Sequence, residues 1–231
     1  MRPLPLFHPP NLDIVSKNRL NVTKSEREWK MVKVSAILLG AGESKRMGVN
    51  KLTLPWGRKT LFEHCLDTLL QSNISEVVVV LGRRTADMWG SLEKTGVRVV
   101  MNPSYRRGMS TSIRKGVRAI DSASEGILIA LGDQPFLKVA TVNALIRAFR
   151  MMDRGIIVPS FRGRRGHPVI FHRKFAEELL RLRGDAGARS IIQRHPGDVR
   201  NVSVRSEGVI KDIDTRGDYR KGRMGCERQR S

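Results

Sequence analysis

The sequence predicts an α/β protein whose central sheet is mostly parallel and covered by helices on both faces. Short apolar runs of strand length alternate with segments whose apolar residues recur at helical spacing, from Val34 to about Val158. The runs are continuously apolar, which is typical of strands buried on both faces. With 231 residues, of which 40% are hydrophobic, the chain is long enough for one sizeable domain or for two small ones.

The expected elements follow one another in a regular order. Continuous apolar runs predict strands at 34–39, 77–81, 97–101, 127–131 and 156–158. Helical spacing of apolar residues, as in Leu61, Phe62, Cys65, Leu66, Leu69 and Leu70, predicts helices at 61–70, 85–94, 111–120 and 139–152. The pattern then changes, and it predicts a hairpin at 160–172, helices near 173–183 and 187–195, and short strands at 199–204 and 208–213.

Three parts are expected along the chain. Residues 1–31 are polar, contain proline and show no period, so they predict a flexible N-terminal extension, and Met31 is a candidate for the true start. Residues 32–220 form the predicted domain. Residues 221–231 form a basic C-terminal tail, which we expect to be frayed after Tyr219.

The chain is strongly basic. It contains 43 Lys and Arg against 22 Asp and Glu, a net charge of +21, and such a field attracts polyanions. The basic residues are scattered in small clusters, however, and neither a zinc-finger spacing nor an aromatic RNA-binding motif accompanies them. We therefore expect no specific nucleic-acid partner, and we assign part of the excess to binding a small phosphorylated ligand.

The cysteines and the apolar runs bear on the compartment. The two cysteines, Cys65 and Cys226, belong to no Cys/His metal cluster, which suits a reducing compartment. The first residues make a poor signal peptide, and the apolar runs reach only about six residues, too short to span a bilayer. The sequence therefore predicts a cytoplasmic protein with no membrane partner.

A glycine-bearing loop, Gly40 to Lys51, follows the first strand. Its glycines let the backbone approach a phosphate chain, and Arg46 and Lys51 supply positive charge for a triphosphate, with the Ser44 hydroxyl beside them. It is neither a Walker A loop nor a dinucleotide fingerprint. The loop is either a phosphate-binding loop or an ordinary glycine turn with surface cations.

Carboxylates follow at two later points. Asp133 closes the fourth strand, where a carboxylate beside a phosphate loop is well placed to hold Mg²⁺, although a turn or helix cap would also explain it. A second acidic group lies at 212–219, where alternation along the predicted strand puts Asp212 and Asp214 on one side. We expect Asp218 to cap a helix or to pair.

These motifs together resemble the MobA-like nucleotidyltransferases. The pattern Leu-x-Ala-Gly-x-Ser-x-Arg-Met-Gly, then Lys, over 39–51 is similar to the family signature, with Gly40 where the family usually has Ala. Gly132-Asp133-Gln134-Pro135 resembles its metal motif. Residues 212–218 resemble its late Asp-Ile-Asp-Thr-Pro-x-Asp segment, with Arg216 in place of Pro. The resemblance covers roughly 33–219 and is closest to the molybdenum cofactor cytidylyltransferases, because the guanylyltransferase branch usually has Gly-Gly at Ala41-Gly42.

The resemblance implies a three-layer Rossmann-like nucleotidyltransferase fold, GT-A-like, for residues 32–220. It also implies roles for particular residues. The catalytic set is Arg46, Lys51, Asp133 and Asp214, of which Asp133 and Asp214 hold the metal. The nucleotide-binding set is Leu39, Gly40, Ala41, Gly42, Glu43, Ser44, Gly48, Gly82, Asn102, Gly108, Ser110 and Ser112. The acceptor-binding set is Gln134, Pro135, Gly166, His167, Pro168, Asp185, Gly187, Ala188 and Arg189. His167 in a hairpin is more often structural than a catalytic base, and an ion pair with Asp185 would equally explain Arg189.

The implied reaction is transfer of CMP from CTP to the phosphate of molybdopterin, the molybdenum cofactor, with release of pyrophosphate. Mg²⁺ or Mn²⁺ is the expected cofactor, and a molybdenum hydroxylase is a possible client. Three alternatives stay open at this point: a GTP-dependent guanylyltransferase, a sugar-phosphate nucleotidyltransferase, and a non-catalytic protein that binds and delivers the molybdenum cofactor.

Overall fold

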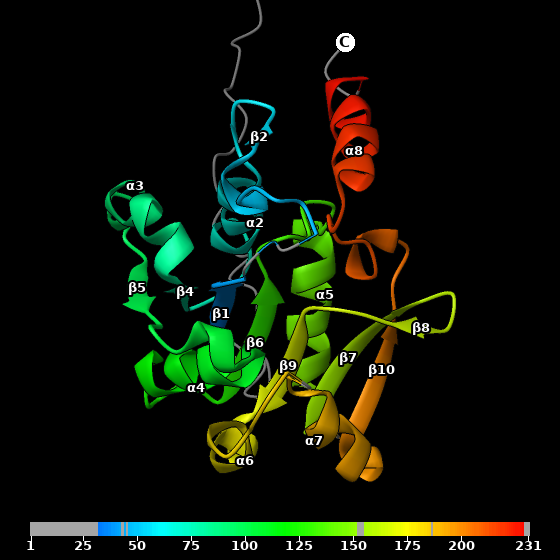
Figure 1. Ribbon diagram of the computed structural model, residues 1–231. Coiled ribbons are helices and arrows are strands. Elements are labelled where there is room, and N and C mark those ends of the chain that lie inside the picture. The colour runs from blue at the N-terminus through cyan, green and yellow to red at the C-terminus, as the bar shows by residue number, and fades with distance from the viewer. Residues whose placement is uncertain (1–31, 43, 45, 152–154, 186, 229–231) are drawn as a thin grey trace, which may run out of the picture. The chain divides into compact units, whose positions relative to one another are not determined.

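A computed structural model describes residues 32–42, 44, 46–151, 155–185 and 187–228, with only the backbone described at 225–228 (Figure 1). The chain divides into two units, Met1–Met31 and Val32–Ser231. The first unit, on which we predicted a flexible extension, lies outside the described residues.

The second unit is built on one main sheet with the strand order β10-β7-β9-β6-β1-β4-β5, and with β8 paired to β7. Strand β9 is antiparallel to β6 and β7, and β8 to β7, whereas the other neighbouring strands are parallel. The strands are β1 (Val34–Gly40), β4 (Glu76–Leu81), β5 (Arg98–Met101), β6 (Gly126–Leu131), β7 (Ile156–Phe161), β8 (Arg164–Arg165), β9 (Val169–His172) and β10 (Val199–Ser203).

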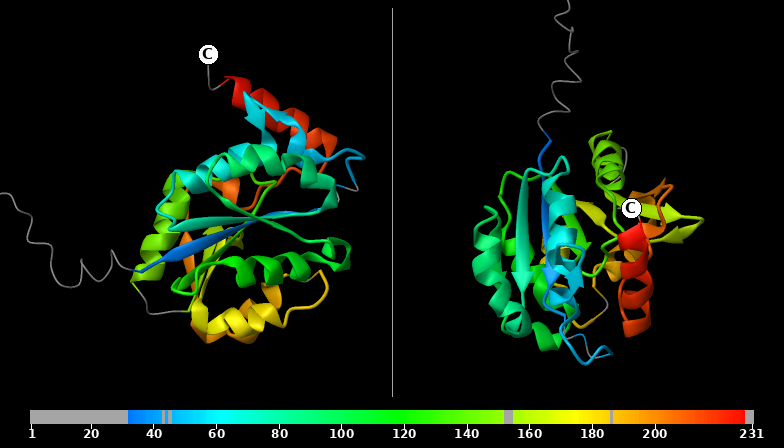
Figure 2. Two further views of the ribbon diagram at one scale, coloured as in Figure 1. Left: turned by 90° about the vertical axis from the view of Figure 1, so that its left-hand side faces the viewer. Right: turned by 90° about the horizontal axis from the view of Figure 1, so that it is seen from above.

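Helices cover both faces of this sheet (Figure 2). Alternate residues of β1 point to opposite faces, so Val34, Ala36 and Leu38 join one apolar core and Ile37 and Leu39 the other. The first core includes α2 (Leu61–Leu70), α3 (Trp89–Glu93) and α5 (Val139–Arg150); the second includes α4 (Met109–Ala119), α6 (Ala176–Leu180) and α7 (Arg189–Arg194). The prediction of a mostly parallel sheet between two helical layers is confirmed.

Several elements differ from the sequence prediction. A small hairpin, β2 (Pro55–Trp56) with β3 (Lys59–Thr60), precedes α2, whose N-terminus Thr60 and Glu63 close as a capping box. The helix expected at 85–94 is a 3-10 segment, Arg83–Met88, followed by the short α3. The strand expected at 208–213 is instead a 3-10 turn, Glu207–Val209, followed by an irregular stretch. Gly208 approaches the backbone of Phe136 so closely that an added Cβ would lie 2.1 Å from its carbonyl oxygen.

The segment after Tyr219 is helical where we expected it to fray, since α8 runs over Arg216–Arg228. The helix packs on the β2–β3 hairpin. The Tyr219 hydroxyl donates to the Pro55 carbonyl oxygen at 2.5 Å, and Gly222 lies against Trp56, where an added Cβ would be 2.6 Å from the ring. This docking brings the segment before α8 to the carboxyl end of the main sheet.

Phe62 of α2 supports the two loops that leave the sheet at this end. A Cβ at Gly40 would lie 2.6 Å from its ring, and a Cβ at Gly132 would lie 2.5 Å from it. Gly40, which departs from the family's usual Ala, therefore has a packing reason: the ring fills the space of a methyl group. The Phe62 ring thus contacts the starts of the loops after β1 and β6 and holds them side by side.

None of the helices in the described part of the chain combines the length and the apolar character that crossing a membrane requires.

Packing of α4 on the sheet gives the first testable prediction. A Cβ at Gly116 would lie 2.3 Å from Cγ2 of the buried Ile37, whereas a Cβ at Gly90 of α3 meets nothing within 4 Å. We expect Gly116→Val to lower the free energy of unfolding by about 1–3 kcal/mol through overpacking, and Gly90→Val to leave it nearly unchanged. Urea unfolding of both variants measures this, and equal effects would contradict the packing account.

Candidate functional site

A cleft of about 510 Å³ lies at the carboxyl ends of β1 and β6. Ligands of such sheets bind at this edge, beyond the strand ends. The residues that line the cleft come from the loop after β1, the turn before α4 and the start of that helix, the end of β6, the loop before α7 and the segment before α8. They are Leu39, Ala41, Gly42, Ser44, Arg46, Lys51, Leu52, Tyr105, Arg106, Gly108, Met109, Ser112, Leu131, Asp133, Asp185, Asp212 and Asp214.

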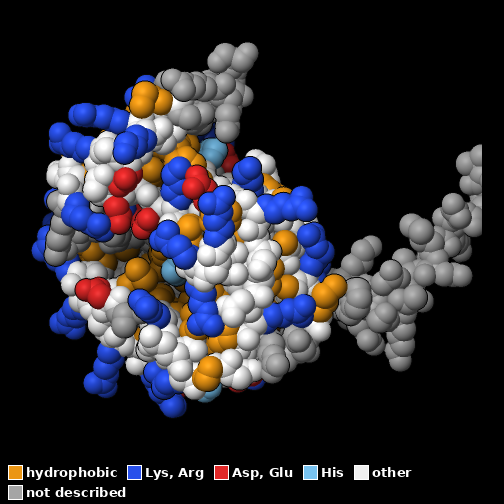
Figure 3. Space-filling model, turned by 90° about the vertical axis from the view of Figure 1, so that its right-hand side faces the viewer, with side chains coloured by type: hydrophobic (Ala, Val, Ile, Leu, Met, Phe, Trp, Pro, Cys, Tyr) orange, Lys and Arg blue, Asp and Glu red, His pale blue; other side chains and the backbone are white. Residues whose placement is uncertain are grey.

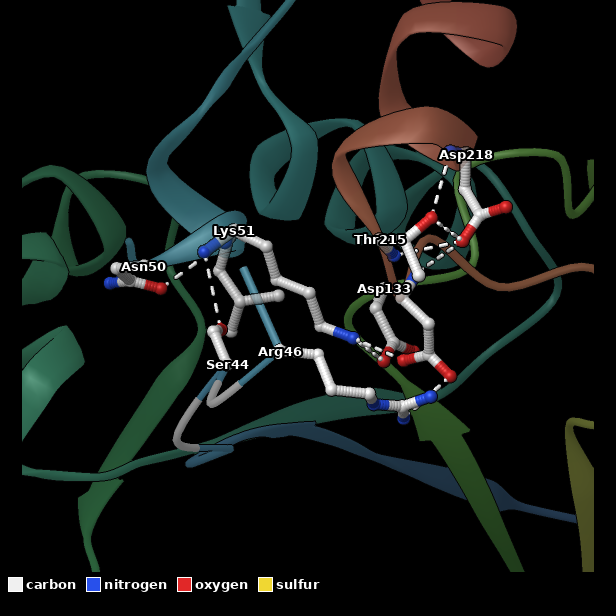
Figure 4. Close-up of polar contacts among 9 residues, drawn as sticks. Ser44, Arg46, Asn50, Lys51, Asp133, Thr215 and Asp218 are labelled. Atoms are coloured by element: carbon white, nitrogen blue, oxygen red, sulfur yellow. Dashed lines mark hydrogen bonds and ion pairs between the residues drawn. The ribbon is translucent and has the colours of Figure 1, made fainter. Parts of the chain in front are cut away.

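All four residues of the predicted catalytic set meet in one ion-pair network, of which Figure 4 labels Arg46, Lys51 and Asp133. Lys51 Nζ lies 2.6 Å from Asp133 Oδ2 and 2.9 Å from Asp214 Oδ1. Arg46 Nη2 lies 2.8 Å from the other oxygen of Asp214. The Lys51 side chain is only 11% exposed, whereas that of Arg46 is 69% exposed. The network joins positions up to 168 residues apart in the chain.

Local backbone structure fixes Lys51. It begins a 3-10 turn, Lys51–Thr53, whose Leu52 N–H donates to the Asn50 side chain. The Lys51 N–H donates to Ser44 Oγ at 3.2 Å, so a hydroxyl of the glycine loop after β1 holds the lysine backbone. The loop and its cation are therefore positioned as one piece.

A capping box at the start of α8 fixes Asp214. The Thr215 N–H donates to Asp218 Oδ2 at 2.8 Å, and the Asp218 N–H donates back to Thr215 Oγ1 at 3.1 Å. The Asp214 N–H also reaches Asp218 Oδ2, at 3.3 Å. Asp218 is thus a cap, as expected. In addition, the Ile213 N–H donates to the Asp133 carbonyl oxygen at 2.9 Å, which ties the two carboxylate segments together.

The charges in the network support one another. Burial alone would lower the pKa of Lys51, but the Asp133 and Asp214 carboxylates outweigh it and raise that pKa. Burial alone would raise the pKa of Asp214, but the bonds from Lys51 and Arg46 prevail and lower it. Burial, and then the Asp214 charge, raise the pKa of Asp212. Lys51 is therefore cationic and Asp214 anionic around neutral pH.

The donor set fits a divalent cation shared with a ligand. Asp133 Oδ1 is buried without a hydrogen-bond partner, and carboxylate oxygens are the protein ligands that Mg²⁺ prefers. Within the described ranges no group of three or more His, Cys, Asp or Glu side chains gathers around one point. Asp133 and Asp214 would thus supply two ligands, and phosphate oxygens and water the rest, as is usual for Mg²⁺.

The predicted nucleotide-binding residues divide into three groups. Leu39, Ala41, Gly42, Ser44, Gly108 and Ser112 line the cleft, whereas Gly40, Gly48, Gly82, Asn102 and Ser110 do not. Glu43 lies outside the described residues. Gly82 acts through packing, since a Cβ there would lie 3.1 Å from both the Ala41 carbonyl oxygen and the Tyr105 ring. The buried Asn102 donates to the Thr111 and Ser112 hydroxyls and so fixes the start of α4.

Two backbone N–H groups at the start of α4 are bonded to a later loop of the chain. The Met109 N–H donates to Asp185 Oδ1 at 3.1 Å, and the Ser110 N–H donates to the Gly184 carbonyl oxygen at 3.2 Å. Gly108, with φ of +105°, permits this contact, because a Cβ would lie 2.6 Å from Gly184. The loop at 184–185 therefore caps the helix, and a ligand there meets the Asp185 carboxylate instead.

Among the predicted acceptor-binding residues, only Asp185 lines the cleft. Gln134, Pro135, Gly166, His167, Pro168, Gly187, Ala188 and Arg189 do not. His167 is held by its N–H, which donates to the Val209 carbonyl oxygen at 2.8 Å. Burial lowers the pKa of His167, and the Asp133 charge offsets this only in part, so the imidazole is neutral at pH 7.

The cleft also contains residues that sequence reasoning did not select. Tyr105, Arg106 and Met109 line it beside Gly108, and Leu52 and Leu131 supply apolar surface. Tyr105, Arg106 and Met109 lie between Asn102 and Ser112, which the sequence analysis placed in the nucleotide-binding set, so that interval was the available signal. The face shown in Figure 3 carries many Lys and Arg side chains with few acidic ones between them, which agrees with the net charge.

Comparison with known proteins places the chain in a family. Residues 36–199 match the family model described as the MobA-like NTP transferase domain. Three curated relatives cover most of the chain. The purine catabolism protein PucB of Bacillus subtilis is 33% identical (79% of this chain, 92% of the relative). The nicotine blue oxidoreductase of Paenarthrobacter nicotinovorans is 31% identical (79% and 92%). The molybdenum cofactor cytidylyltransferase of Escherichia coli is 26% identical (82% and 95%).

Solved structures share the architecture. Rv0371c of Mycobacterium tuberculosis, in a complex with manganese, has a TM-score of 0.70 at 27% identity, over 84% of this chain and 99% of that one. A nucleotidyl transferase from Methanothermobacter, Mth528, has a TM-score of 0.74 at 26% identity, over 85% and 99%. The Rossmann-like nucleotidyltransferase fold implied by the motifs is thus confirmed.

The depressed pKa of Asp214 gives the second prediction. A carboxylate whose folded pKa lies below its unfolded value of about 3.9 stabilises the protein above that pH, and the contribution disappears as pH falls through the folded pKa. We expect Asp214→Asn to lower the free energy of unfolding at pH 7 by about 1–2 kcal/mol, because the pair is partly buried. The deficit should shrink below about pH 4.

Urea unfolding of wild type and variant at pH 7 and pH 3 measures this. Asp67→Asn is the control, because Asp67 pairs with the 53% exposed Lys59 and so contributes less. A deficit of equal size at both pH values would show that the Asp214 charge does not stabilise the fold.

Proposed function

The chain belongs to the MobA-like NTP transferase family, and on this premise we propose that it transfers CMP from CTP to the phosphate of molybdopterin and releases pyrophosphate. The observation that carries the proposal is the meeting of Lys51, Arg46, Asp133 and Asp214 at the mouth of the phosphate loop. Two cations that suit a triphosphate and two carboxylates that suit a divalent metal lie within one hydrogen-bonded group.

The chain's own residues would orient the reacting groups. Arg46, Lys51 and the backbone of 40–48 hold the triphosphate, and Asp133 and Asp214 hold Mg²⁺ or Mn²⁺. When bound, the metal neutralises charge on the phosphates and on the departing pyrophosphate. An oxygen of the acceptor phosphate bonds to the α-phosphorus while the bond from that phosphorus to the bridging oxygen of pyrophosphate breaks. Positioning and charge neutralisation do most of the work.

No general base is required. The attacking phosphate is already ionised near pH 7, since the second pKa of a phosphate monoester is about 6. His167, a nearby titratable group, is half-buried and hydrogen-bonded through its backbone, which supports a structural role for it.

The choice of CTP as the nucleotide and of molybdopterin as the acceptor rests on fewer observations. Ala41 lines the cleft at the position where the guanylyltransferase branch usually has Gly, which favours CTP over GTP. The E. coli cytidylyltransferase matches 82% of the chain. The other two curated relatives carry different names, so the decisive experiment varies the nucleotide and tests whether molybdopterin is required.

That experiment incubates the pure protein with Mg²⁺ and each of the four nucleoside triphosphates, with and without molybdopterin, and measures pyrophosphate release. Pyrophosphate release only in the mixture that contains both CTP and molybdopterin supports the proposal. Molybdopterin-dependent pyrophosphate release with GTP would be compatible with the proposed metal site but would contradict the assignment of CTP as the nucleotide. No release despite bound molybdopterin would indicate a delivery protein.

A variant of Asp133 gives the third prediction. We expect Asp133→Asn to lower kcat by about 10²–10³, the range seen when one electrostatic stabiliser of a transition state is removed, while circular dichroism shows a folded protein. The control Asp121→Asn removes a carboxylate that pairs with Lys33, outside the cleft lining, and should keep full activity. An Asp133→Asn protein that only raised KM for the acceptor would contradict the metal assignment.

A further inference from the structure

The carboxylates assigned to the metal are both paired with cationic side chains of the protein itself. Lys51 Nζ contacts one oxygen of each, at 2.6 Å from Asp133 and 2.9 Å from Asp214. Arg46 takes the second oxygen of Asp214, at 2.8 Å. An ammonium group bridging two carboxylates occupies the kind of position that a divalent cation takes.

We propose that Lys51 and Arg46 hold the place of the metal in the nucleotide-free protein, and that metal and nucleotide enter by an exchange of partners. The phosphate oxygens take Lys51 and Arg46 away from the carboxylates, and the metal takes their place on Asp133 and Asp214. This inference rests on the proposed function, because it assumes that a nucleoside triphosphate and a divalent metal share the cleft.

Charge balance explains why the two ligands must come together. Two cationic and two anionic side chains neutralise one another in the network. A divalent cation alone would add two positive charges beside Lys51, which is nearly buried and whose ion-pair partners among the described residues are these two carboxylates. A triphosphate brings the negative charge that this exchange requires.

The geometry also allows the exchange. Lys51 is anchored at its backbone by Ser44 and its 3-10 turn, while its four-carbon stem carries the charge on a flexible arm beside the phosphate loop. Arg46 is largely exposed and lies on that loop. Asp133 Oδ1, buried and without a partner, remains as an oxygen that neither cation satisfies.

The test is a titration of Mn²⁺ followed by electron paramagnetic resonance, in which free Mn²⁺ is counted directly. We expect nucleotide-free wild type to bind Mn²⁺ weakly and Lys51→Met to bind it about tenfold more tightly, the factor associated with loss of one charge-assisted hydrogen bond. The same variant should bind CTP more weakly than wild type. Tighter binding of Mn²⁺ together with weaker binding of CTP is the result expected if Lys51 occupies the metal position in the nucleotide-free protein.

The control Lys59→Met removes the same charge at an exposed pair with Asp67, and should leave Mn²⁺ binding unchanged. Arg46→Met is a second variant at an exposed position, so it keeps the test valid if Lys51→Met does not fold, and it should tighten Mn²⁺ binding by a smaller factor. Unchanged or weaker Mn²⁺ binding by the folded variants would overturn the inference.

The same titration separates this inference from the proposed function. In wild type, bound CTP should raise the affinity for Mn²⁺, and Mn²⁺ that of CTP, by the same factor. If wild type binds no CTP at any Mn²⁺ concentration, the proposed function fails. If wild type binds both, but Lys51→Met leaves the nucleotide-free Mn²⁺ affinity unaltered, only the exchange fails.

Discussion

The bridge that Lys51 makes between Asp133 and Asp214 is the interaction on which the arrangement of the site depends. It joins three segments that are far apart in the chain: the loop after β1, the end of β6 and the stretch before α8. Packing contacts elsewhere in the fold hold these segments in place. Phe62 lies beneath the two loops, and α8 docks on the β2–β3 hairpin. The fold thus converts distant sequence positions into one group of charges.

The bridge also shows how a strongly basic chain can hold ionised carboxylates at the carboxyl end of its main sheet. The lowered pKa of Asp214 follows from its two cationic neighbours, Lys51 and Arg46. The net positive charge of the chain attracts the phosphates of a nucleotide. In the two proposals, the cations that attract the nucleotide, Lys51 and Arg46, are also the ones that pair with the proposed metal ligands. This links the proposed reaction to the proposed exchange.

Much of this could be predicted from the sequence, because buried strands and glycine loops leave strong local signals. The strands and the glycine loop after β1 are of this kind, whereas the four charged residues were selected because their motifs resemble those of the family. Contacts between distant segments leave no such signal. Asp214 reaches the cleft from an irregular stretch and not from a strand, and the start of α4 is capped by Asp185 from a later loop. The helix after Tyr219 depends on packing against Trp56, which a basic tail sequence does not reveal.

The most direct measurement is a crystal structure of the protein with CTP and Mn²⁺, with the metal located from its anomalous scattering. The account predicts Mn²⁺ on the carboxylates of Asp133 and Asp214, with Lys51 and Arg46 moved onto the phosphates of the nucleotide. Manganese bound elsewhere, or Lys51 still bridging the two carboxylates beside a bound triphosphate, would contradict it.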